Sequence, residues 1–160
     1  MSHDPYVAHD IHLRRVHQAL LARIRELGES GAPPGSAAPT DLPDRVIFAC
    51  KALLFHHHAE STGLFPRLRR AGRLRSADIA FLDACDRDHV TIHVVTQRLL
   101  AEGEAPHPRP SEIATLAREI AAHFDPHAAD EEAGLAPERL RAMIPAEELE
   151  AMAREASRPR

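Results

Sequence analysis

Residues 56–66 read HHHAESTGLFP and residues 127–137 read HAADEEAGLAP, with His, Glu, Gly, Leu and Pro at matching places. In each stretch, the first histidine precedes a glutamate by four residues. On a helix this H-x3-E spacing puts both side chains on one face, one turn apart. The repeat therefore predicts two helices that present paired ligands, His56 with Glu60 and His127 with Glu131, to one site.

The apolar residues around these stretches have the period of amphipathic helices. They step by three or four over residues 5–27, 43–64, 79–100 and 111–134, and each stretch gives way to glycine or proline. Pro66 and Pro137 are expected to end the second and fourth helices, which would put their glutamates near the end of the molecule. A segment of helix-forming composition at 138–156 predicts a further short helix.

No segment alternates with the period of a strand, so the predicted fold is all-α. The simplest packing for four helices of this length is an up-down-up-down four-helix bundle with a short C-terminal helical tail. The 160 residues are expected to form one domain, with a core at 5–137 and a tail at 138–160. The phenylalanines are expected in the core.

Charge and cysteine content narrow the classes of partner. The net charge is −4 and the arginines are scattered among acids, so we expect no nucleic-acid partner. Cys50 and Cys85 are the only cysteines and form neither a disulfide scaffold nor a C-x-x-C pair. Without a signal sequence or an apolar run of membrane length, the chain is expected to be soluble and cytoplasmic, with no membrane partner.

Histidine makes up 12 of the 160 residues, and several fall at ligand spacing. His89 and His93 form an i, i+4 pair on the predicted third helix. On the first helix, His17 lies about 16 Å before the helix end at ~1.5 Å per residue, which matches the height of His56 on the second helix. His9 and His12 are alternatives on the first helix, of which His9 overshoots that height.

Imidazole and carboxylate donors without thiolate suit first-row metals such as iron or manganese, and two carboxylates that can bridge allow two ions. The candidate ligands are His17, His56, Glu60, His89, His93, His127 and Glu131. His123 and Cys85 each lie one turn before a candidate ligand and are candidates for positions beside the metals, with simple packing as the alternative. His57 and His58 are expected to face loop or solvent, and Asp130 and Glu132 to face solvent.

This series of motifs, over nearly all of residues 9–137, resembles the hemerythrin-like HHE cation-binding family, as do the L-F-P and L-A-P endings after each glutamate. The resemblance implies a non-haem di-iron centre in the bundle core with both glutamates bridging, although another first-row metal is possible. It implies binding, sensing or scavenging of oxygen, or of a related ligand such as nitric oxide or peroxide. Oxygen-carrying hemerythrins have a longer spacing ending in aspartate on the fourth helix, whereas this chain has H-x3-E, similar to the wider HHE group.

Three other functions remain compatible with these residues. One is a di-iron oxidase or an enzyme that consumes peroxide or nitric oxide, so whether the chain is an enzyme stays open. Another is iron storage or repair of damaged iron centres, which is disfavoured because the Cys-bearing extra domain that resembles such repair proteins is absent. The last is a helical bundle that binds no metal, in which the H-x3-E pairs are surface contacts.

Overall fold

The computed structural model describes residues 4–31 and 39–156, and all regular structure in these residues is helical. The elements are α1 (Pro5–Glu29), α2 (Leu42–Ala59), a π-helical turn η1 (Glu60–Leu64), α3 (Phe65–Arg70), α4 (Ser76–Gly103), α5 (Pro110–Gly134), α6 (Pro137–Met143) and α7 (Ala146–Ala156). The all-α prediction is confirmed, and there are more helices than the predicted four plus a tail. Most of the predicted first loop, residues 32–38, lies outside the described part of the chain.

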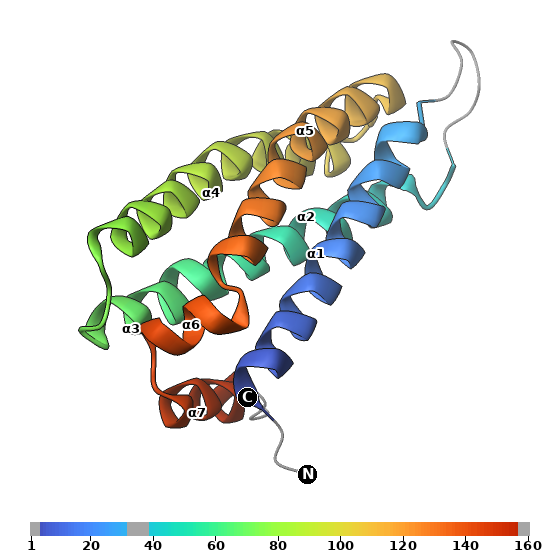
Figure 1. Cartoon of the computed structure of the whole chain (residues 1–160). Coiled ribbons are helices and arrows are strands. Elements are labelled where there is room, and N and C mark those ends of the chain that lie inside the picture. The colour runs from blue at the N-terminus through green and yellow to red at the C-terminus, as the bar shows by residue number, and fades with distance from the viewer. Residues whose placement is uncertain (1–3, 32–38, 157–160) are drawn as a thin grey trace.

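The four long helices α1, α2, α4 and α5 pack side by side, and α6 and α7 lie at one end (Figure 1). Two apolar clusters fill the interior. The main cluster is built around Ile24, Leu53, Ile92 and Ile120, all fully buried. The tail cluster is built around Leu13, Phe65, Leu82 and Leu140, and α6 and α7 contribute to it.

The order in which each helix meets these clusters shows its direction. Along the chain, α1 and α4 pass from the tail cluster to the main cluster, whereas α2 and α5 pack in the main cluster and lead into tail-cluster residues, Leu64 and Leu135, that follow them. Consecutive long helices therefore run in opposite directions. The middle of α1 and of α4 and the C-terminal turns of α2 and α5 border the space between the two clusters, which makes this space a meeting point for all four.

The prediction that Pro66 ends its helix is wrong. Pro66 stands in the first turn of α3, where a proline removes no helical hydrogen bond, and the chain is helical from residue 42 to residue 70. Glu60 consequently lies well inside a helical segment instead of near the end of the molecule. The C-terminal helices α6 and α7 pack against α1 at the end of the molecule. There the Tyr6 hydroxyl donates a hydrogen bond of 2.9 Å to the carbonyl of Ile144.

The prediction of which apolar residues are buried is partly wrong on α2 and α4. Phe65 and Phe124 are fully buried, but Phe48 and Phe55 are exposed on the outer face of α2. On α4 the helix is confirmed, whereas the apolar residues Ile79, Val90 and Val94 that suggested it lie on its exposed face. Among the described residues, no helix combines the length and the apolarity needed to cross a membrane.

Candidate metal centre

A layer of polar side chains separates the main cluster from the tail cluster. Its buried members are His17 from α1, His57 from α2, Glu60 from η1, His89 from α4, and His127 and Glu131 from α5. The side chain of His56 is 11% exposed and faces the same layer. Burying this many ionisable groups is costly unless they are paired or bind a metal, so the layer calls for a chemical reason.

The histidines of this layer meet in two pairs through their Nε2 atoms. The Nε2 atoms of His17 and His56 are 3.0 Å apart, and those of His89 and His127 are 3.1 Å apart. The predicted match in height between His17 and His56 is thus confirmed. Each pair joins two different helices, so ring nitrogens from all four long helices converge.

Each glutamate reaches one histidine of each pair. Glu60 lies 3.3 Å from Nε2 of His56 through Oε1 and 3.6 Å from Nε2 of His89 through Oε2. Glu131 Oε2 lies 3.2 Å from Nε2 of His17 and 3.7 Å from Nε2 of His127. Two carboxylates that each span both pairs form an arrangement in which two cations could be held side by side and bridged.

The opposite ring nitrogen is anchored in two of these histidines. His17 Nδ1 donates to Glu132 Oε1 at 3.0 Å, and Arg14 donates to the other oxygen of Glu132 at 2.8 Å. Since an ionised carboxylate only accepts hydrogen bonds, the proton of His17 is on Nδ1 and the lone pair of Nε2 faces the centre. The prediction that Glu132 faces solvent is wrong, because α1 packs beside α5 and brings His17 to it.

His89 is anchored in the same way through a serine. Ser61 Oγ lies 2.9 Å from His89 Nδ1 and donates a hydrogen bond of 2.9 Å to Asp86. Ser61 follows Glu60 in the π-helical turn η1, so this turn places a candidate ligand and a partner of another ligand in consecutive positions. π-helical turns inside α-helices occur frequently at functional sites. His127 Nδ1 lies 3.4 Å from Asp88 Oδ2, too loosely arranged to count as a hydrogen bond.

Burial favours the neutral form of three imidazoles of this layer, His56, His57 and His89. It lowers the pKa of His56 to about 3 and that of His89 to about 4, and it lowers the pKa of His57 as well. Burial, followed by the charge of Glu131, raises the pKa of Glu60 well above its ordinary value. For Glu131, burial acts upward, but the close approach of His17 and the neighbouring His127 and His56 leave the pKa lowered. Neutral imidazoles have the free lone pair that metal binding requires.

The residues fit a bound cation because many of their buried polar atoms have no hydrogen-bond partner. These atoms are both ring nitrogens of His57, His127 Nδ1, Glu60 Oε2 and both carboxylate oxygens of Glu131. Two groups have donor atoms within 4.8 Å of one another: His17, His56, Glu60 and Glu131 in one, and His57, His89 and His127 in the other. Nitrogen and oxygen donors without thiolate match first-row metals.

Six of the seven predicted ligands come together here, and His93 does not. His93 is exposed on α4 and its Nε2 contacts the side-chain amide of Gln97 at 3.3 Å. His12 is exposed on α1, while His9 is half-buried with Nε2 unpartnered. Whether any one residue binds metal stays a prediction.

The two residues predicted beside the metals have different surroundings. Cys85 is buried, and burial, with the nearby carboxylate of Glu131 next in size, raises the pKa of its thiol. His123 is exposed on α5 and lines a surface cavity of about 420 Å³ between α4 and α5. The same cavity is lined by His127, so it connects the surface to a candidate ligand.

The prediction that His57 faces loop or solvent is wrong, since only 6% of its surface is exposed. His57 follows Leu53 by four residues and Cys50 by seven, and both are fully buried. That spacing continues the buried face of α2, and it was the signal available in the sequence. The sequence carried no such signal for Ser61 and Glu132 as hydrogen-bond partners of candidate ligands, because their contacts depend on which helices are neighbours.

The composition of this layer agrees with the comparison to known families. The family described as Hemerythrin HHE cation binding domain matches residues 10–139, which include all the buried histidines and glutamates of the layer. No curated protein and no solved structure gives a significant match to the chain. A match over most of the chain, which includes this layer of buried histidines and glutamates, places this protein in the hemerythrin HHE cation-binding domain family.

Proposed function

We propose that α1, α2, α4 and α5 form an up-down-up-down bundle around a non-haem di-iron centre that binds, senses or scavenges oxygen or a related small ligand. The observation that carries this proposal is the position of the two carboxylates. Glu60 and Glu131 each contact one histidine from the His17–His56 pair and one from the His89–His127 pair. Such carboxylates suit bridging positions between two ions, with one histidine pair on each.

Two ferrous ions in these positions would supply two electrons and an open coordination position for a diatomic ligand or peroxide. The chain itself supplies the rest. Glu132 and Ser61 fix the rings of His17 and His89 through Nδ1, so that each Nε2 lone pair keeps its direction. The main and tail clusters exclude bulk water from both sides of the layer.

The cavity between α4 and α5 supports the exchange of a small ligand with the surface. Thr91 and Asp88 line it on α4, and Ala122 and His123 line it on α5. It reaches His127, the only buried histidine among its lining residues. We propose that small ligands approach the centre through this cavity.

The surroundings favour a carrier, sensor or scavenger over an oxidase that uses an aromatic radical. Tyr6 is the only tyrosine, and tryptophan is absent. The Tyr6 hydroxyl is bound to the Ile144 carbonyl in the tail cluster, away from the polar layer. An enzyme that consumes peroxide or nitric oxide is the second candidate, and one observation supports it: exposed His123 in the cavity could deliver protons to a reaction near His127.

The test is metal analysis and spectroscopy of protein purified without an affinity tag. We expect two iron ions per chain in the wild type and loss of iron in the His56→Ala and Glu131→Ala variants. The exposed His93→Ala variant is the matched control and should keep its iron. A native protein that holds no first-row metal would contradict the proposal.

The same sample separates the two candidate functions. A reversible spectrum on exposure of the reduced protein to oxygen, without turnover, supports the carrier or sensor. Steady consumption of peroxide or nitric oxide by the iron-loaded protein supports the enzyme. In the latter case, His123→Phe should slow turnover while the iron content stays at the wild-type value.

A further inference from the structure

His57 is a buried histidine that neither H-x3-E motif includes. Its side chain comes from α2, directly after His56, and both of its ring nitrogens are buried without a hydrogen-bond partner. A buried polar side chain that leaves both nitrogens unsatisfied is costly, since each desolvated group without a partner costs stability. The position of His57 therefore calls for an unseen partner.

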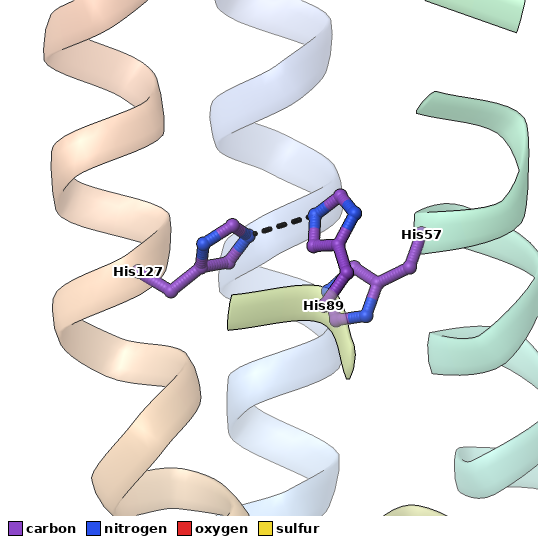
Figure 2. Close-up of side chains that lie close together, drawn as sticks. All are labelled: His57, His89 and His127. Carbon is purple, nitrogen blue, oxygen red and sulfur yellow. Dashed lines mark hydrogen bonds between the residues drawn. The ribbon is translucent and has the colours of Figure 1, made fainter. Parts of the chain in front are cut away.

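The ring of His57 lies beside the His89–His127 pair (Figure 2). It stacks on the ring of His89, with the ring centres 4.1 Å apart and the planes inclined by 13°. It stands edge-on to His127, with the ring centres 5.5 Å apart. One ring nitrogen from each of the three histidines lies within 4.8 Å of the others, so a single cation could contact all three.

The consecutive residues His56 and His57 can both face this layer because the inner side of α2 faces three other helices, α1, α4 and α5. His56 is directed towards α1, where it meets His17, while His57 is directed towards α4 and α5. Glu60 lies between these directions on the helical wheel, four residues after His56 and three after His57. The α2–η1 segment thus presents three metal-ligating side chains instead of the two in the motif.

We propose that His57 is a ligand of the ion held by His89 and His127, so that this ion has three imidazole ligands and its neighbour has two. The inference rests on the proposed two-metal centre and deepens it. An unequal division of histidines makes the two positions chemically different, with the nitrogen-rich position nearer the cavity lined by His127. Small ligands and different metals would then distinguish one position from the other.

The test uses Co²⁺ as a probe of metal-free protein made without an affinity tag. His57→Phe keeps an aromatic ring for the stack on His89 but removes both nitrogens. His58→Phe is the matched control, because His58 is the next residue and is exposed. Titration counts the Co²⁺ ions bound per chain, and proton NMR counts the paramagnetically shifted histidine ring N–H signals.

We expect the wild type and His58→Phe to bind two Co²⁺ ions with the same set of shifted signals. His57→Phe should bind one ion as before and the second at least about tenfold more weakly, with one histidine signal missing. If His57→Phe keeps both affinities and every signal, the assignment of His57 is wrong while the two-metal centre stands. If the wild type itself binds no Co²⁺, the proposed centre fails.

A second substitution, with a check of folding, separates a ligand role of His57 from a packing role. His57→Leu replaces the ring with a smaller apolar side chain, and far-UV circular dichroism of each metal-free variant establishes that the helices are intact. A ligand role predicts the same missing signal in both variants. A packing role predicts that His57→Phe, which preserves the stack, behaves as the wild type in metal binding, and that result would overturn the proposal.

Discussion

The ring of His17 is held in one orientation by a chain of charged residues on α1 and α5. Glu132 accepts the hydrogen bond of His17 Nδ1 and is bound in turn by Arg14, which also pairs with Asp10 at 3.0 Å. Arg14 is 45% exposed, so its ion pairs contribute little to stability. The role of these linked residues is to fix which ring nitrogen of His17 is free.

Removing the carboxylate of Glu132 should therefore weaken metal binding without removing a ligand. For Glu132→Ala, we expect an affinity about 10–100-fold lower, the usual cost of losing a hydrogen-bond partner of a ligating histidine. Competition between the protein and a chromophoric chelator for Co²⁺ measures this. Asp130→Ala changes an exposed carboxylate two residues away and should leave the affinity unchanged; equal affinities in the two variants would refute the role of Glu132.

The two thiols should be nearly inert in the folded protein. Both are buried; burial raises the pKa of Cys50 to about 12, and burial, with the charge of Glu131 next, raises that of Cys85. Because only the thiolate attacks disulfide reagents, we expect both to react on the order of a hundredfold or more slowly at pH 8 than in denaturant. Cys50→Ala and Cys85→Ala identify each phase, and a thiol that reacts at the unfolded rate would contradict the expectation.

At the scale of the elements, the two H-x3-E stretches have different local structures despite their similar sequences. The first enters the π-helical turn at Glu60 and continues through α3, whereas the second ends with α5 at Gly134. The glycines that match in sequence have correspondingly different surroundings. A Cβ on Gly63 would meet open space, while a Cβ on Gly134 would collide with the ring of Phe81.

Alanine at these two positions should thus change stability in opposite directions. Gly63→Ala should stabilise by about 0.4–1 kcal/mol, because alanine restricts the unfolded chain and nothing obstructs it in the turn. Gly134→Ala should destabilise by about 1–3 kcal/mol, because the Phe81 ring, which lies under the Arg139 guanidinium, has to move. Urea unfolding of the metal-free variants measures both changes, and equal signs would show that the local surroundings do not decide them.

The sequence predicted the existence of the long helices better than the faces they bury. On α4, the buried face follows Leu82, Cys85 and His89, but apolar Val90 and Val94 beside it produce a second helical pattern that the sequence alone does not rank. His93 was a candidate ligand because it follows His89 by four residues, but the buried face of α4 continues through Ile92 and Thr96 instead. On α2, the expectation that adjacent histidines face apart excluded His57, although an interior between four helices has room for both directions.

At the scale of the whole molecule, the polar layer between two apolar clusters is a compromise between function and stability. The layer holds five histidines and the carboxylates of Glu60 and Glu131, and six of these seven ionisable side chains are buried. Buried ionisable groups without full partners reduce stability. The two clusters, which do not depend on metal, have to offset that cost.

Replacing Glu60 by glutamine separates these two effects. Glu60 is 6% exposed and its Oε2 has no hydrogen-bond partner, so glutamine removes a buried acid while keeping its shape. For the metal-free Glu60→Gln protein, we expect a free energy of unfolding about 1–3 kcal/mol higher than that of the metal-free wild type. With metal present the order should reverse, because only the wild type gains the stabilisation of a ligand bound to the folded state, about 4.1 kcal/mol at a free metal concentration of 1,000 times Kd.

Urea unfolding with and without saturating Co²⁺ measures both differences on the same two proteins. Glu147→Gln, an exposed acid on α7, is the control and should follow the wild type in both conditions. A metal-free Glu60→Gln protein that is less stable than the wild type would mean that the carboxylate is well paired within the chain itself. The order of stabilities without metal would then reflect that pairing. It would show that the Glu60 carboxylate does not cost the folded protein stability, which contradicts the compromise between metal binding and folding.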